Sequence, residues 1–186
     1  RKPESQSHTL YWMTPLLIVG GICLWMWWHI PYLWAFVVYA TVFHHVRQFY
    51  GMLRWYQRLN GRPCDASAFF LYALTGLPFV LFHFRPLGQL QHQGVYTDQD
   101  LFFYPQPELF QGGLVLYGLG VLAWLVFEWR LRRRGIREWN RCLAVLGPAA
   151  LYASCFLLGD SFPAVVFPLL LAHGIPYLAI MSLSLT

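Results

Sequence analysis

Residues 109–129, LFQGGLVLYGLGVLAWLVFEW, run directly into residues 130–141, RLRRRGIREWNR. The first stretch carries a single charged residue, Glu128. A membrane-spanning helix needs about 20 consecutive, mainly apolar residues. The second stretch carries six arginines, and basic residues collect at the cytoplasmic ends of membrane helices. The two stretches together predict a transmembrane helix that ends at the cytoplasmic surface.

The composition of the whole chain agrees with this interpretation. Of its 186 residues, 58% are hydrophobic and 11% are charged, whereas soluble domains are about one quarter charged. The chain therefore lacks the polar residues that would cover a soluble domain of its size. Its apolar content excludes a disordered chain, and its length with four cysteines excludes a small disulfide-built scaffold.

Five further apolar segments are found on either side of residues 109–129. We expect membrane spans at residues 9–30, 32–58, 66–84, 109–129, 139–158 and 162–185, with an outer loop at 85–108 and a basic inner loop at 130–138. The sequence thus predicts an all-α, polytopic integral membrane helical bundle of about six transmembrane helices. These helices form a single transmembrane domain over residues 1–186.

The distribution of charge predicts the orientation of this bundle. With the N-terminus in the cytoplasm, eleven of the thirteen basic residues lie on the cytoplasmic side: Arg1, Lys2, Arg54, Arg58, Arg62 and the six arginines from Arg130 to Arg141. Four acids lie on the opposite side: Asp98, Asp100, Glu108 and Asp160. We therefore expect a bacterial inner (cytoplasmic) membrane protein. Arg54, Arg58 and the cluster from Arg130 to Arg141 are expected to face anionic lipid headgroups, so the net charge of +5 requires no nucleic acid.

Polar residues inside the membrane are concentrated in residues 32–58. At about 100° per residue, one helix face carries Thr41, His44, His45 and Gln48, and a neighbouring stripe carries Arg47, Gly51, Arg54 and Arg58. A rise of about 1.5 Å per residue places His44 and His45 about 18–20 Å from the outer boundary of their span. The same count places His173 about 17 Å into the last span. The three histidines therefore share one level near the middle of the membrane.

An ionisable group at this depth requires a partner or a function. Imidazole is a common ligand of iron, copper and zinc. We therefore predict that His44, His45 and His173 bind a metal ion, iron before copper or zinc, or that two of them hold a haem. Gln48 and Tyr50 are predicted to orient the rings, and Arg47 to pair with a carboxylate or propionate or to extend to the inner surface. The alternative is that His44 and His45 hydrogen-bond to carbonyls and to each other in a packed bundle.

Three functions remain open at this stage. The first is redox chemistry on a lipophilic substrate, such as a quinone, a carotenoid or a fatty chain, at the metal or haem. The second is a non-catalytic subunit of a larger membrane complex, either structural or binding pigment or lipid, with other membrane subunits as partners. The third is a transporter, in which Pro163, Pro168 and Pro176 break the last span beside the polar span. The sequence leaves open whether the protein is an enzyme.

The pair His44-His45 resembles one fragment of the histidine boxes of membrane fatty-acid desaturases and hydroxylases. Those families require several such boxes, whereas the seven histidines of this chain are scattered and form no second box. That assignment is therefore excluded. Histidines on several spans are also similar, in architecture alone, to membrane carotenoid-cleaving dioxygenases and to the haem-binding subunits of respiratory complexes. No motif beyond the isolated histidines supports either family.

Overall fold

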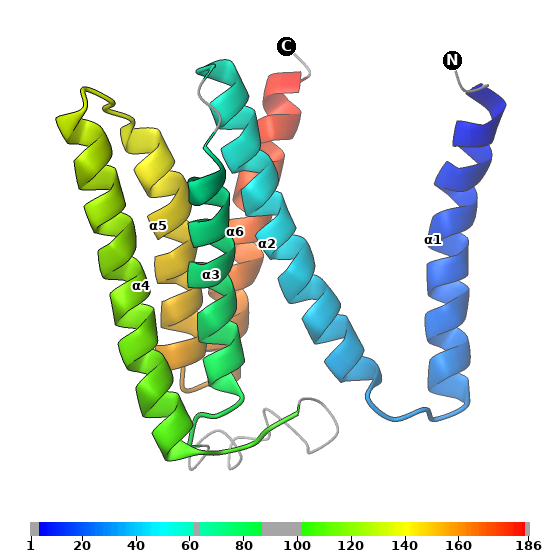
Figure 1. Ribbon diagram of the computed structural model, residues 1–186. Coiled ribbons are helices and arrows are strands. Elements are labelled where there is room, and N and C mark those ends of the chain that lie inside the picture. Colours follow the sequence, from blue (N-terminus) through cyan, green and yellow to red (C-terminus); the bar gives the residue numbers. More distant parts are fainter. Residues whose placement is uncertain (1–3, 62–63, 87–101, 185–186) are drawn as a thin grey trace.

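The computed structural model describes residues 4–61, 64–86 and 102–184, and within these ranges the protein is all-helical and contains no strand (Figure 1). The elements are α1 (Glu4–Trp27), α2 (Leu33–Leu59), α3 (Asp65–Phe82), α4 (Pro107–Arg133), α5 (Trp139–Ala153), the π-helical turn η1 (Ser154–Leu158) and α6 (Phe162–Ser184). Arg1, Lys2, Arg62, Asp98 and Asp100, on which part of the predicted orientation depends, lie outside the described residues. The all-α class is confirmed.

Each predicted span coincides with one helical segment; α1 begins five residues before its predicted span, and α4 ends four residues after its own. This helix continues to Arg133, so the first arginines of the predicted inner loop 130–138 belong to its last turn. Cations are stabilised at a helix C-terminus by the helix dipole. The helix stops at Gly135, which has φ +83°, and the amides of Gly135 and Ile136 close the end on Arg132 O and Leu131 O, both at 3.0 Å. The connection between α4 and α5 is therefore shorter than predicted.

Three segments among the described residues are long and apolar enough to cross a membrane. They are α3, α4 and the continuous stretch Trp139–Leu158 formed by α5 and η1. α2 is long enough, but its histidines, arginines and glutamines make it more polar than these three. These lengths and compositions indicate a membrane protein.

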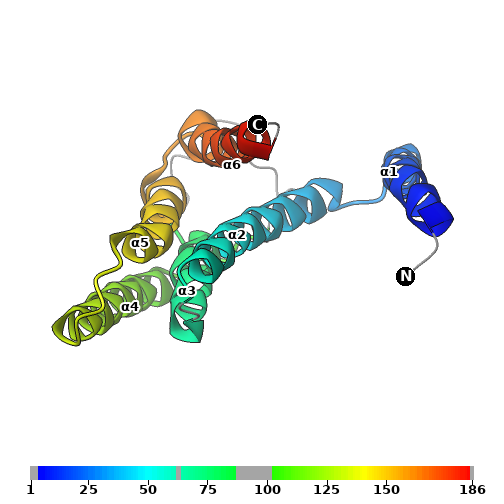
Figure 2. The same ribbon diagram turned by 90° about the horizontal axis from the view of Figure 1, so that it is seen from above.

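α3 and α5 form the centre of the bundle. α5 packs against α2 and α3 and, through η1, against α6, whereas α4 packs mainly against α3 and also contacts α5 through side chains (Figure 2). Tyr152 on α5 is fully buried and donates a hydrogen bond to Val42 O on α2 at 3.3 Å. The core is formed by Val42, Val46, Phe49 and Leu53 of α2 with Leu71, Leu74, Phe82, Trp124, Val145, Ala149, Tyr152, Phe156, Val165 and Leu169 of the other helices. α2 and α6 are thereby held on neighbouring sides of α5.

Glycines on α4 allow its close approach to α3. A Cβ atom at Gly113 would overlap Leu81 Cδ2, and one at Gly120 would lie 3.1 Å from Leu74 Cδ2. Small residues permit close backbone contact between membrane helices. The close contact with α3 depends on these two positions, whereas Gly112 and Gly118 face open space.

Two helices differ from the sequence-based expectation: α6 is not broken by its prolines, and α1 does not pack along the bundle. α6 is one continuous helix from Phe162 to Ser184, so its prolines do not break it. The discontinuous helix on which the transporter interpretation depended is therefore absent from the described part of this span. α1 stands apart from the bundle and contacts it near the turn to α2, where the rings of Trp25 and Phe36 lie 5.6 Å apart (Figure 1).

Arg141 is buried in the bundle, which corrects its assignment to the cluster facing lipid headgroups. Its guanidinium group donates two hydrogen bonds to Glu128, at 2.8 and 3.2 Å, and one to Glu138 at 3.0 Å. The side chains of Arg141 and Glu128 are each 3% exposed. A buried charge must be paired, and α5 begins early enough to carry Arg141 inward against α4. The exposed arginines of this cluster are Arg130, Arg133, Arg134 and Arg137.

Candidate functional site

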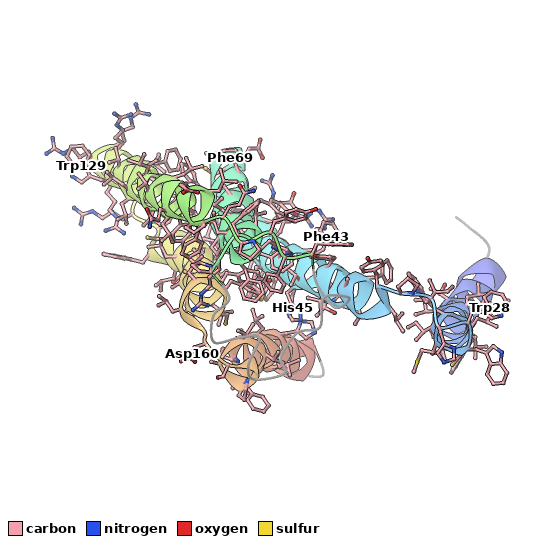
Figure 3. All side chains as sticks on the ribbon, turned by 90° about the horizontal axis from the view of Figure 1, so that it is seen from below. Trp28, Phe43, His45, Phe69, Trp129 and Asp160 are labelled. Carbon is pink, nitrogen blue, oxygen red and sulfur yellow. The ribbon has the colours of Figure 1, made fainter. Side chains whose placement is uncertain are left out.

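The helical period of α2 carries two adjacent histidines to different surroundings. Val42, Val46, Phe49 and Leu53 form the buried stripe of this helix, and His45 lies beside it with 5% of its surface exposed. His44, one position earlier, is exposed at the edge of that stripe. Figure 3 shows His45 pointing from α2 toward α6, whereas Phe43 points to the other side of the helix. Both histidines are thereby turned toward the helix that carries His173.

The three predicted histidines come into direct contact. The ring centroids of His45 and His173 are 4.5 Å apart and those of His44 and His173 are 5.3 Å apart. His44 and His45 are separated by 6.3 Å. We call these three side chains the histidine cluster. Two helices that are distant in sequence therefore place three imidazole rings around one point.

Gln48 fixes the orientation of one ring of the cluster. Its Nε2 donates a hydrogen bond to His173 O at 3.1 Å, and its Oε1 accepts one from His173 Nδ1. Because Nδ1 then carries the proton, Nε2 of His173 keeps a free lone pair. A ligand histidine in a metal site is usually held by such a hydrogen bond to its second nitrogen.

His44 and His45 have no comparable hydrogen bonds. Neither forms one with any residue in the described ranges, although His45 is almost completely buried. The alternative in which both histidines bond to carbonyls and to each other therefore finds no hydrogen bond here to support it. The ring nitrogens of His45 keep some exposed surface, however, because the fully buried side-chain atoms without a hydrogen-bond partner among the described residues are Ser67 Oγ and Trp124 Nε1.

The spacing of the rings suits one ion, but their orientation does not. A metal–nitrogen bond of about 2.1 Å places two imidazole centroids on one ion between about 4.5 and 6.4 Å apart, and all three separations fall in this range. However, no group of three or more His, Cys, Asp or Glu among the described residues has the arrangement of a metal site. His45 and His173 are stacked with their planes 21° apart, so their lone pairs point past each other. Binding an ion would require one ring to turn about its Cβ–Cγ bond.

The same distances are less suitable for a haem held by two histidines. Axial imidazoles on opposite faces of a haem have centroids about 6.4 Å apart, which is more than the separations of His173 from His44 and His45. His44 and His45 are far enough apart, but they are adjacent on one helix and leave no room for a macrocycle between them. The arrangement favours a single ion over a bis-histidine haem.

A pocket of about 480 Å³ opens beside the cluster and is lined by His44, Arg47, Gln48 and His173. Arg47 does not meet a carboxylate among the described residues, and its Nη1 donates a hydrogen bond to Tyr72 Oη at 3.2 Å. The pocket therefore combines imidazole groups with one positive charge, and gives a ligand access to the cluster.

Tyr50 does not orient the histidines. Its hydroxyl accepts a hydrogen bond from Arg54 Nε at 3.1 Å, and its ring lies beneath the guanidinium groups of Arg47 and Arg54. The reason is helical geometry, since five residues of α2 turn Tyr50 about 140° away from His45. Tyr50 belongs with the arginine stripe.

A second histidine contact, not predicted from the sequence, lies where α2 begins and α3 ends. His83 interacts with Tyr39 Oη through Nε2 at 2.9 Å and with Phe79 O through Nδ1 at 2.8 Å. Both of its nitrogens are thus occupied by protein groups, unlike those of His44 and His45. His29 is exposed at the turn after α1, and His92 lies outside the described residues.

Comparison with known proteins gives no match to a protein-family model, to a curated protein or to a solved structure. The function must therefore be inferred from the chemistry of the site.

Proposed function

We propose that the protein is a six-span metalloprotein of the bacterial inner membrane, with its N-terminus in the cytoplasm. His44, His45 and His173 bind one metal ion, with iron expected before copper or zinc, and the ion carries out redox chemistry on a lipophilic substrate. The observation that carries this proposal is the buried His45 ring. It has no hydrogen-bond partner among the described residues and lies within 4.5 Å of the His173 ring, centroid to centroid.

The surroundings of the cluster support the same proposal. Gln48 holds His173 with Nε2 available for a ligand. The pocket beside His44 allows a substrate to approach from the membrane. Imidazole ligands suit iron, copper and zinc alike, so the choice of iron rests on the redox function and is open to test.

The test is metal analysis and absorption spectroscopy of the detergent-purified full chain. We expect about one metal ion per chain, with an absorption band that changes when the protein is reduced. His45→Ala and His173→Ala should each lose the ion, because each variant keeps only two of the three imidazole ligands and two are too few to hold it. Gln48→Leu should weaken metal binding about 10- to 100-fold, as loss of a supporting hydrogen bond typically does. His29→Asn is the matched control, since it removes an exposed imidazole outside the cluster and should retain the ion.

Two results would contradict the proposal. One is wild-type protein that binds no iron, copper or zinc, even after incubation with each ion, and gains no thermal stability from them. The other is a protein that binds only zinc and shows no change on reduction, which would retain the site and exclude the redox function. The melting temperature of each variant shows whether a lost ion reflects lost folding.

A non-catalytic subunit of a larger membrane complex is the second candidate. The position of α1 favours it, because this helix leaves the bundle and its described contacts with the bundle lie mainly near the turn to α2 (Figure 1). The exposed apolar side chains of α1, which include Leu16, Leu17 and Val19, offer a surface to a partner helix. Purification from the native membrane distinguishes the two functions: stoichiometric partners that are lost with His173→Ala, without a bound metal, support the subunit function.

A further inference from the structure

A second pocket, of about 680 Å³, lies along the arginine stripe of α2. Its lining includes Arg47, Tyr50, Gly51, Arg54, Trp55 and Arg58, and we call it the arginine pocket. These residues are separated by three or four positions and therefore share one helix face. Arg47 also lines the pocket of the histidine cluster, so the two pockets are neighbours.

The arginine pocket carries more positive charge than its surroundings neutralise. Arg54 forms an ion pair with Asp65 at 2.6 Å, and the side chain of Asp65 is 91% exposed. Arg47 and Arg58 form no ion pair with any residue whose position is described. Three guanidinium groups with one carboxylate leave a formal charge of +2. Like charges held together in this way favour the binding of an anion.

Two of the three guanidinium groups, those of Arg47 and Arg54, are held in place before any ligand arrives. Arg54 donates hydrogen bonds to Tyr50 Oη and Gln57 Oε1, both at 3.1 Å. Gln57 is itself buried and donates to Cys64 O at 3.1 Å. Arg47 and Arg54 lie 5.2 and 5.3 Å from the centroid of the Tyr50 ring. A fixed, planar guanidinium group matches the geometry of a phosphate, with which it forms paired hydrogen bonds.

The level of the pocket in the membrane identifies the source of the phosphate. Counting about 1.5 Å per residue from Tyr32, Arg54 lies about 33 Å and Arg58 about 39 Å along α2, beyond a hydrocarbon core of about 30 Å. Arg47 lies about 22 Å along the helix, inside the core. The pocket therefore extends from the headgroup layer toward the acyl chains. Trp55, half exposed at its edge, is the residue type found at this boundary.

We propose that the arginine pocket binds the phosphate group of an anionic phospholipid from the inner leaflet. The phosphate is held by Arg54 and Arg58 with Arg47 beneath it, and the acyl chains lie against the apolar surface of the bundle. Gly51 lines the pocket, and a Cβ atom at this position would meet nothing within 4 Å, so a larger side chain there has space to extend into the pocket. This inference depends on the membrane location of the protein and not on the proposed metal site.

The experiment is native mass spectrometry of the full chain in detergent, titrated separately with phosphatidylglycerol, phosphatidylcholine and inorganic phosphate. We expect phosphatidylglycerol to bind at least about tenfold more tightly than phosphatidylcholine. The double variant Arg47→Gln/Arg58→Gln should weaken phosphatidylglycerol binding about 30-fold, since each interfacial arginine contributes a factor of about five. Gly51→Leu should weaken it comparably, because leucine fills the pocket and leaves every charge in place.

The charge-matched control is Arg132→Gln/Arg133→Gln. These arginines lie at the end of α4, over the rings of Trp139 and Trp129, and their loss should change the affinity less than about threefold. An equal loss in this control would overturn the proposal, since general surface charge would then explain the binding. Equal affinity for phosphatidylcholine, or unchanged affinity in Gly51→Leu, would overturn it as well. Displacement of the lipid by millimolar phosphate would identify a site for free phosphate instead.

The metal proposal and the lipid proposal fail independently in these experiments. His45→Ala should bind phosphatidylglycerol as the wild type does, because His45 does not line the arginine pocket. A metal-free wild type that selects phosphatidylglycerol would refute the metal site and leave the lipid site intact. The melting temperature of Gly51→Leu shows whether this variant is folded, so that a loss of lipid binding can be attributed to the leucine in the pocket.

Discussion

His45 is both almost completely buried and without a hydrogen bond to any described residue. Helical periodicity places His44, His45 and Gln48 on one face, and counting along each span places His173 at the same depth. Both arguments depend only on the spacing of residues within a single helix, and this spacing can be read from the sequence. The pairing of Gln48 with His173 depends on how α6 is rotated toward α2. That rotation is set by packing against α5, so sequence periodicity could not predict it.

Arg141 shows the complementary case, in which composition is misleading at a single residue. It belongs to an arginine-rich segment, yet among the arginines of residues 130–141 it is the one that is buried, where it pairs with the carboxylates of Glu128 and Glu138. Arg141 lies thirteen positions after Glu128 and three after Glu138. These separations in sequence are compatible with many arrangements of the three side chains. Only the start of α5 at Trp139 decides that Arg141 points into the bundle.

We predict that Arg141→Met lowers the free energy of unfolding by about 3–5 kcal/mol, the cost of removing one partner from a buried ion pair. Glu128 would lose its only ion-pair partner among the described residues. Unfolding in mixed micelles with increasing denaturing detergent measures the change. Arg137→Met is the control, because Arg137 is exposed and its loss should cost less than about 0.5 kcal/mol. Equal stabilities of the two variants would show that the buried pair contributes little.

At the scale of the helices, their existence and approximate bounds could be predicted because each predicted segment is mainly apolar, and three of the described segments are long and apolar enough to cross a membrane. The residues at which the helices end were harder to predict from the sequence. α4 gains a turn from Arg130 to Arg133 because Gly135 adopts a left-handed conformation and closes the helix there. The π-helical turn η1 after α5 has no sequence signal that distinguishes it from an ordinary helix.

The contact of α4 with α3 gives a prediction for this scale. Gly113→Val should destabilise the protein by about 1–3 kcal/mol, because its side chain would overlap the buried Leu81 and force the two helices apart. Gly112→Val, at the neighbouring position that faces open space, should be nearly neutral. The double variant Gly113→Val/Leu81→Ala should recover part of the loss. Thermal unfolding in detergent measures all three, and equal effects at positions 112 and 113 would contradict this packing.

At the scale of the whole molecule, the order in which the helices pack could not be predicted. Several helices are apolar on all sides, so their sequences do not show which face meets protein and which meets lipid. The central position of α5 follows instead from specific contacts, such as those of Tyr152 with Val42 and of Tyr117 with Ala149 O at 3.0 Å. The separation of α1 from the bundle also lacked a signal, because its composition resembles that of a packed span.

The orientation in the membrane can be tested with α4 alone, because one helix joins Gln106 to the arginine-rich turn. Its 27 residues extend about 40 Å, enough to cross the bilayer. In a variant with Cys23→Ser and Cys64→Ser, Gln106→Cys should react with a membrane-impermeant maleimide only from the outside. Arg137→Cys should react only from the cytoplasmic side. Both sites are exposed. Reaction of both from one side would show that α4 does not cross. The reverse pattern would place the arginines outside and overturn the orientation, and with it the assignment of the arginine pocket to the inner leaflet.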